Sequence, residues 1–254
     1  MAPTLVNAAF GALLAAALLG AAFDRRSVAV VVAAAVLPDL DAVASLVVDG
    51  ATNALLHNVW IPLALGALLY WDTTARTDPT ARTDPNASEQ GGRSWLRDRY
   101  GWYGVRVAWV ALAAFAVAGI APELFGFAGA NLLYPVHDAY YLVRGRLLFS
   151  TQEGIVQTFV AVGSEGPGIL PLRSPGTTET YVVPTWVNPD GRPGLSIGVE
   201  RELHLVRSGW QAVVVAAAGC LLAVRSREVR LRETGTTNRG EGADALDGEN
   251  GGAP

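Results

Sequence analysis

Two aspartates lie inside a long apolar segment of the chain. Asp39 and Asp41 stand in the sequence Leu-Pro-Asp-Leu-Asp-Ala, which interrupts the apolar run 27–48. On insertion scales one carboxylate at the centre of a bilayer costs roughly 2.5–3.5 kcal/mol, so two buried acids are expected to have a function. Carboxylates bind divalent cations, and a bound cation would offset the cost of burying them. We therefore predict that Asp39 and Asp41 hold a metal ion.

Further side chains that bind metals stand at the ends of other apolar segments. His57 opens one segment, Glu123 closes another, and His137 and Asp138 follow shortly after. If successive segments cross a membrane in alternating directions, these side chains meet at one face of it. The predicted ligand set is Asp39, Asp41, His57, Glu123, His137 and Asp138. Carboxylate with imidazole suits Zn²⁺, Mn²⁺ or Fe²⁺. Either Glu123 or His137 is predicted to act as the catalytic general base.

Pro38 sets the expected local geometry around the two acids. Proline disfavours a helical conformation at Leu37, but it suits the first position of a new helix. The pattern predicts a span broken into two half-helices, with both acids in the first turn of the second. A first-turn position favours ionised carboxylates, and near a break the two side chains can converge on one cation. The alternative is that the two acids simply cap a half-helix.

The elements that position these residues follow from the composition. Of 254 residues, 51% are hydrophobic and only 17% are charged, whereas soluble domains carry about 25% charged residues. The apolar runs are 5–23, 27–48, 54–71, 101–121 and 209–224. The first run has the length of a helix of about 29 Å, which matches a bilayer core. We predict a mainly α polytopic membrane protein with about five transmembrane helices.

The chain divides into four predicted regions. Residues 1–150 form a membrane-embedded core, in which 124–150 is expected to be an interfacial helix or helix pair. Residues 151–206 alternate apolar and polar side chains between Gly and Pro, which indicates a small β-rich extramembrane insert. Residues 207–226 form the last transmembrane helix. The polar, Gly-rich segment 227–254 is predicted to be disordered.

Arginine distribution predicts the orientation in the cell membrane. All 19 basic residues are arginine: two directly follow the first run, five lie in 72–100 and four in 225–232. The segment 124–208 holds six over a much longer stretch. Because cytoplasmic loops are enriched in basic residues, the N-terminus is predicted to lie outside and the C-terminus inside. No basic patch indicates nucleic acid, so membrane lipid and a small or lipid-like substrate are the expected partners.

The first 150 residues resemble the YdjM-like family of membrane-bound metal-dependent hydrolases. The resemblance is carried by the Leu-Pro-Asp-Leu-Asp-Ala break, by the histidine of the third run and by the segment GIAPELFGFAGANLLYPVHDAYY. The lysine-free composition is similar to that of archaeal, particularly haloarchaeal, members, which suggests a halophile. The family pattern implies a metal held by an N-terminal His, the Pro-Asp-x-Asp acids, a His-Arg and His-Ser/Thr pair opening the third span, and a late Asp.

The chain keeps only part of that pattern. Asp39, Asp41 and His57 are retained. Asn7 stands for the N-terminal His, Thr52-Asn53 for the His-Arg pair, Asn58 for the Ser/Thr, and Glu123 for the late Asp.

Three functional hypotheses result from this pattern. The first is a metal-dependent hydrolase, in which a divalent cation activates water and the substrate is amphiphilic or a phosphoester. The second is a catalytically degenerate membrane scaffold, favoured by the replacements at Asn7, Thr52 and Asn53. The third is a transporter-like proton or ion relay, because broken helices with carboxylates at mid-membrane occur in transporters.

Overall fold

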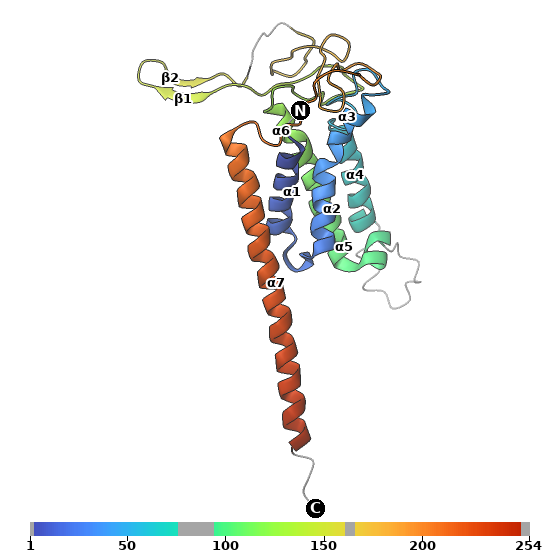
Figure 1. Ribbon diagram of the computed structural model, residues 1–254, viewed down its shortest axis with the longest axis vertical. Coiled ribbons are helices and arrows are strands. Elements are labelled where there is room, and N and C mark those ends of the chain that lie inside the picture. The colour runs from blue at the N-terminus through green and yellow to red at the C-terminus, as the bar shows by residue number, and fades with distance from the viewer. Residues whose placement is uncertain (1–2, 76–93, 161–165, 250–254) are drawn as a thin grey trace, which may run out of the picture.

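The protein forms a bundle of helices that is covered at one end by a long irregular segment (Figure 1). This computed structural model describes residues 3–75, 94–160 and 166–249. The predicted mainly helical class is confirmed. Two described helical stretches, Arg25–Ala44 and Trp95–Leu124, are long and apolar enough to cross a membrane, and Thr4–Leu18 is a shorter apolar helix. The described structure therefore supports two candidate spans rather than the five expected.

The first half of the bundle contains the predicted break at Pro38. Helix α1 (Thr4–Leu18) is followed by a turn, η1 (Gly20–Ala22), and by α2 (Arg25–Val36). The chain then tightens into a 3-10 turn, η2 (Leu37–Leu40), and continues as α3 (Asp41–Ala44). The expected non-helical conformation at Leu37 is wrong, because Leu37 keeps helical angles, φ −53° and ψ −41°. Pro38 lies in the first turn of η2, where its missing N–H is tolerated. The two half-helices thus stay in line.

The second half of the bundle begins after a long turn. It contains α4 (Trp60–Tyr70), the π-helical turn η3 (Trp71–Ala75), and α5 (Trp95–Ala113), which kinks at Gly101. Helix α5 continues through the π-helical turn η5 (Ala114–Ile120) into α6 (Ala121–Leu124). Helix α4 buries none of its own side chains and presents large apolar residues on its surface, including Leu63 and Leu68.

Small residues let the helices approach closely near the acids. A Cβ atom on Gly119 of η5 would lie 2.7 Å from Cγ of Pro38 and 2.9 Å from the carbonyl oxygen of Ala35. The core around this contact is built largely from alanine. Its buried members are Ala15, Ala16, Leu19, Phe23, Val31, Ala35, Val110, Ala114 and Ala118. Close packing of η5 on η2 therefore brings Glu123, one turn beyond Gly119, to the level of Asp39.

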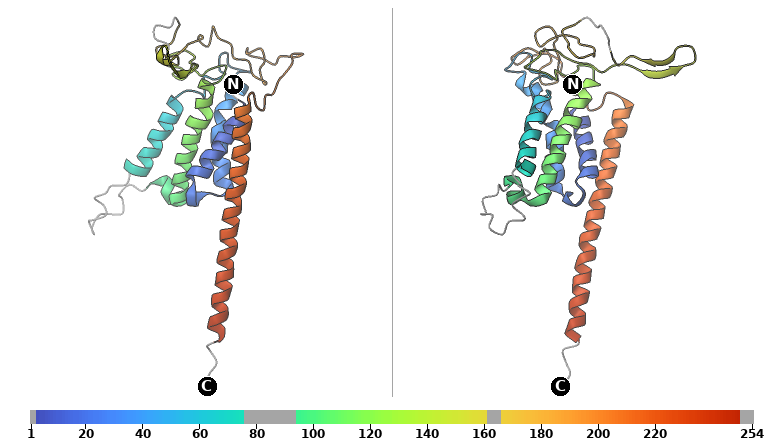
Figure 2. Two further views of the ribbon diagram at one scale, coloured as in Figure 1. Left: turned by 90° about the vertical axis from the view of Figure 1, so that its left-hand side faces the viewer. Right: turned by 180° about the vertical axis from the view of Figure 1, so that it is seen from behind.

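The segment between α6 and α7 lies across the end of the bundle formed by α3 and α6 (Figures 1 and 2). Its described residues hold one hairpin, β1 (Leu147–Ser150) with β2 (Gly154–Gln157). The expected interfacial helix within 124–150 is wrong, because no helix follows Leu124 before α7 in the described residues. In the described part of the expected β-rich insert 151–206, the one strand is β2. Hydrogen bonds to the bundle, such as Gly194 N–H to Leu46 O at 2.8 Å, replace strand pairing.

Helix α7 (Gly209–Glu249) packs along α1 and extends past the far end of the bundle (Figure 2). It therefore continues into the segment 227–254, where the sequence predicts disorder. Leu222 and Val229 of α7 pack against the alanine-rich core, and Arg225 pairs with Glu228 at 3.0 Å one turn later. The apolar stripe thus runs beyond the first arginines, which explains why the helix does not end there.

Candidate metal centre

Asp39, His57 and Glu123 meet at the covered end of the bundle. One ligand atom from each lies within 4.8 Å of the other two, and among the described residues this is the one such group. Asp39 comes from η2, Glu123 from α6, and His57 from the turn that leads into α4. His57 and Glu123 are fully buried, and Asp39 is 8% exposed. Two carboxylates and an imidazole at this spacing can hold a metal ion.

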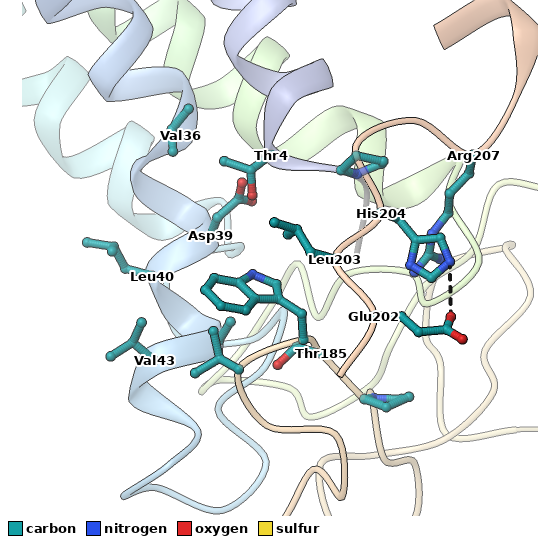
Figure 3. A pocket seen from close by; sticks show the side chains of 15 residues that line it. Thr4, Val36, Asp39, Leu40, Val43, Thr185, Glu202, Leu203, His204 and Arg207 are labelled. Carbon is teal, nitrogen blue, oxygen red and sulfur yellow. Dashed lines mark ion pairs between the residues drawn. The ribbon is translucent and has the colours of Figure 1, made fainter. Parts of the chain in front are cut away.

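Two atoms of these side chains form no well-aligned hydrogen bond among the described residues, although the Thr4 side chain lies beside the Asp39 carboxylate (Figure 3). They are Asp39 Oδ2 and His57 Nε2, and both are buried. The other Asp39 oxygen, Oδ1, lies 3.9 Å from His57 Nε2. An unsatisfied buried polar group costs about 1–3 kcal/mol, more when it is charged, so such atoms require an explanation. A cation shared by these atoms satisfies both of them, and the residues present fit a bound metal.

Asp41 supports His57 instead of joining the group. Its Oδ2 lies 2.9 Å from His57 Nδ1, and the Leu56 N–H donates to both carboxylate oxygens at 2.8 and 3.1 Å. The prediction that Asp39 and Asp41 converge on one cation is corrected, because residues two apart on a helical backbone point about 200° apart. A carboxylate on Nδ1 keeps the proton there and leaves Nε2 for a metal, as in many metal sites.

Two asparagines that the sequence marks as departures lie in the site. Asn7 Nδ2 donates to Asp39 Oδ1 at 3.0 Å, and Asn53 Nδ2 donates to Glu123 Oε2 at 3.0 Å. Both side chains are fully buried, and both Oδ1 atoms lack a partner among the described residues. Only the amide nitrogen can donate to a carboxylate, which assigns each oxygen to the unpartnered position. A buried asparagine in an apolar run was the signal that sequence reasoning passed over.

The segment between α6 and α7, which we call the covering segment, holds the turn that contains Asn53 and His57 in place. Asn53 has a left-handed backbone, φ 55°, which asparagine tolerates better than most residues. Its carbonyl oxygen accepts from the Asn131 N–H at 2.8 Å, and the Tyr140 hydroxyl donates to Thr52 O at 2.6 Å. Burial raises the pKa of Tyr140, so that its hydroxyl remains a donor. The turn is therefore positioned by contacts distant in sequence.

His137 and Asp138 do not join the group, contrary to the prediction. The Asp138 carboxylate accepts from Asn131 Nδ2 at 2.6 Å, and from the backbone N–H and hydroxyl of Thr178 at 3.0 and 2.7 Å. It therefore ties two parts of the covering segment together. His137 lies outside the group of three ligands. The expected helix that would have carried both residues to the bundle is absent, which is why they lie elsewhere.

Burial and the neighbouring acids change the pKa of His57 in opposite directions. Burial by itself lowers the pKa of His57. The hydrogen bond that the His57 ring donates to Asp41 and the charges of Glu123, Asp41 and Asp39 outweigh burial and raise the pKa above its ordinary value. The metal-free site thus attracts a positive charge.

A cavity of about 200 Å³ reaches Asp39 from the surface. Its walls come from the start of α1, from η2 and α3, and from two stretches of the covering segment. In Figure 3, the Asp39 carboxylate lies beside Thr4, and Glu202, His204 and Arg207 lie on the opposite side. The His204 ring pairs with Glu202 at 3.4 Å. A small solute therefore has a route to Asp39, whereas His57 and Glu123 do not line the cavity.

Comparisons with known proteins return no match: no family model, no curated protein and no solved structure is similar to this chain.

Proposed function

We propose that this chain is a membrane-embedded, metal-dependent hydrolase related to the YdjM-like family. Asp39, His57 and Glu123 would hold one divalent cation at the covered end of the bundle. The observation that carries the proposal is the pair of buried, unpartnered ligand atoms, Asp39 Oδ2 and His57 Nε2, beside a third ligand group. Other buried atoms, such as His137 Nε2, also lack a partner, but within the described residues only these two belong to a group of three side chains that can bind a metal.

The chain's own residues supply the remaining parts of a hydrolytic site. Asp41 holds the His57 ring in one orientation. Asn7 and Asn53 each donate to one carboxylate of the group, which limits where those carboxylates point. Glu123 either completes the ligand set or accepts the proton of the attacking water, and its position serves both roles. A bound divalent cation lowers the pKa of water and polarises a carbonyl or phosphoryl oxygen.

The types of ligand atom in the group indicate which of the predicted metals should bind most tightly. Zn²⁺, Mn²⁺ and Fe²⁺ all accept carboxylate with imidazole. Asn7 and Asn53 contact the two carboxylates through their amide nitrogens, and their amide oxygens are buried without a partner among the described residues. Carboxylate or carbonyl oxygens suit Mn²⁺ best among the three. We therefore propose that Mn²⁺ binds at least as well as Zn²⁺.

We also propose that α1, α4 and the first part of α7 cross the membrane with the two longer stretches, with the N-terminus outside. Arginines at the end opposite the site support this orientation. Arg25 opens α2 there, and Arg225 lies 5.6 Å from the Phe23 ring just before it. Basic residues favour the cytoplasmic side. The metal group then faces the outer side of the membrane.

Metal content tests the proposal directly. Full-length protein in detergent is incubated with Mn²⁺, Zn²⁺ or Fe²⁺, desalted, and analysed by mass spectrometry of elements. Near-stoichiometric metal is expected in the wild type and in Asp98→Asn, which changes an exposed carboxylate on α5. Asp39→Asn should lose the metal. Because this change removes one of two neighbouring buried acids, the metal-free variant should unfold at least as high in temperature as the wild type.

The outcomes separate the competing functions. Absence of metal from the wild type with all three cations would overturn the proposal and favour the degenerate scaffold. Metal binding accompanied by proton flux in liposomes, and by no hydrolysis of ester substrates, would favour the ion relay instead.

A further inference from the structure

A second, apolar cavity adjoins the pocket that reaches Asp39. Its volume is about 630 Å³, within the range of about 300–1,000 Å³ typical of ligand pockets. Pro3 and Arg207 line both cavities, so the two lie next to each other on either side of these residues. The two spaces together therefore extend from the metal ligand Asp39, past Arg207, to an apolar compartment.

The walls of the apolar compartment run along the helices. Val6 and Phe10 stand one turn apart on α1, and Val117 and Ala121 stand one turn apart across η5 and α6. Trp210, at the start of α7, lines a further side, and it is half exposed, so the compartment is open to the surroundings of the bundle. Pockets lined mainly by hydrophobic and aromatic side chains take apolar ligands. Because the lining residues follow the helix axes, the compartment suits an alkyl chain that lies parallel to the helices, as lipid chains do in a bilayer.

Arg207 places a cation between the two cavities. Its backbone N–H donates to Gln211 Oε1 at 2.6 Å. Its side chain is exposed, and the neighbouring Glu202 pairs with His204. Figure 3 shows the Arg207 side chain beside His204, across the pocket from Asp39. A guanidinium binds a phosphate through two parallel N–H donors, which gives both affinity and orientation.

From this arrangement we propose that the site takes a single-chain alkyl phosphate, with its chain in the apolar cavity and its phosphate between Arg207 and the metal group. This inference rests on the proposed metal-dependent hydrolase. Hydrolysis of such a monoester forms one bond from the water oxygen to phosphorus and breaks the bond from phosphorus to the alkyl oxygen. The proton released by water passes to the departing alkoxide. An alcohol and inorganic phosphate result.

Quenching of tryptophan fluorescence by 11-bromoundecyl phosphate tests the binding of this ligand class. The experiment uses the full-length protein in detergent, with and without Mn²⁺. Because Trp210 lines the apolar cavity, a saturable quenching component is expected in the wild type and should disappear in Trp210→Phe. The apparent affinity should rise when Mn²⁺ is present.

Two variants probe the two ends of the ligand. Arg207→Gln should weaken binding of the bromoalkyl phosphate at least about tenfold, because a charged hydrogen-bonding partner is lost. Val117→Phe should reduce it by filling the apolar cavity. Their matched controls are Arg227→Gln and Val213→Phe, which change exposed residues of α7 outside both cavities and should leave the affinity unchanged.

Two further probes separate the head from the chain. The alcohol 11-bromoundecanol should bind more weakly than the phosphate, with no dependence on Arg207. Inorganic phosphate alone should not displace the bromoalkyl phosphate at equal concentration. Equal quenching by alcohol and phosphate, or equal affinity in Arg207→Gln and wild type, would show a lipid-filled gap without headgroup recognition and would overturn the inference.

Failure of this inference is distinguishable from failure of the proposed function. Stoichiometric metal with no saturable quenching would leave the metal site in place and remove the alkyl phosphate. Saturable, Arg207-dependent quenching that is the same with and without Mn²⁺, in a protein that binds no metal, would overturn the hydrolase and with it the placement of the phosphate next to a metal.

Discussion

Two pairs of histidine and aspartate lie at the covered end of the molecule, and they differ in how their polar atoms are satisfied. In the first pair, Asp39 Oδ2 and His57 Nε2 are buried and have no partner among the described residues. In the second pair, the Asp138 carboxylate accepts hydrogen bonds from Asn131 and Thr178. The residue types are the same. His137 Nε2 is also buried without a partner among the described residues, so the pairs differ in their carboxylates. Only in the first pair do the unsatisfied atoms belong to a group that includes a third ligand side chain, Glu123.

The difference shows that residue type is insufficient to identify a metal ligand. A carboxylate that already accepts hydrogen bonds on both oxygens gives up those bonds if it binds a cation, and its donors are then left buried. Asp41 lies between the two cases, since its hydrogen bonds go to His57 and to the backbone beside it. The comparison therefore assigns binding to the first pair, orientation to Asp41, and structure to Asp138.

The largest expected effect separates the two histidines. His57→Gln should reduce bound metal from near-stoichiometric to background, because the Nε2 ligand atom is lost. His137→Gln should leave the metal content unchanged, because His137 lies outside the ligand group. Elemental analysis of both purified variants, with thermal unfolding as a check on folding, makes the comparison. Equal metal loss in the two variants would contradict the division between the pairs.

A smaller effect is expected at Asp41. Asp41→Asn keeps an acceptor near His57 Nδ1 but removes the negative charge. The affinity for metal should fall by about 10- to 100-fold, as for other partners of metal-binding histidines. Titration with Mn²⁺ and a competing chelator measures the dissociation constant. Complete loss of metal, equal to that in His57→Gln, would show instead that Asp41 is itself a ligand.

Removal of Asp138 should affect stability and leave metal binding unchanged. Asp138→Ala leaves the buried amide of Asn131 and the half-buried donors of Thr178 without this acceptor, at a cost of about 1–3 kcal/mol in the free energy of unfolding. Denaturant unfolding in detergent measures the change. Asp190→Ala, at an exposed site in the same covering segment, is the matched control with little expected change. Loss of metal in Asp138→Ala with unchanged stability is the contrary result.

The smallest effect concerns pH. As the pH rises, the affinity for metal should increase, whereas the stability of the metal-free protein should decrease. The pKa of His57 is raised in the metal-free protein, so metal binding below that pKa must release a proton from the ring. The affinity for metal should therefore rise with pH by up to about tenfold per unit, and level off above that pKa. In the metal-free protein His57 contributes stability below its unfolded pKa of about 6.5, and that stability is lost as the pH rises through the folded value.

Metal titrations between pH 5.5 and 8.5 measure the affinity, and thermal unfolding over the same range measures the stability of the metal-free protein. His137→Gln is the control, and both pH dependences should be the same in it as in the wild type. An affinity that does not change with pH would contradict protonation of His57 in the metal-free site.

The apolar runs predicted most of the bundle, because a helix in an apolar environment consists of one continuous stretch of apolar residues. Residues 27–48 became α2, η2 and α3, and 101–121 became the later part of α5 with η5. The covering segment was predicted poorly. Its conformation depends on hydrogen bonds to distant partners, such as Val59 N–H to Leu132 O, and these leave no periodic pattern in the sequence.

By itself, the sequence determined that the chain carries acids within apolar runs and a histidine near the start of another run. Polar residues are rare in such runs because burying them costs free energy, so each one can be recognised individually. Which of them form one group was decided only by the tertiary structure. Asn7 lies 32 residues from Asp39, and Asn53 lies 70 residues from Glu123. Helix packing at Gly119 and the turn before α4 bring these side chains together. The direction of each side chain then follows from packing, which spacing along the chain does not encode.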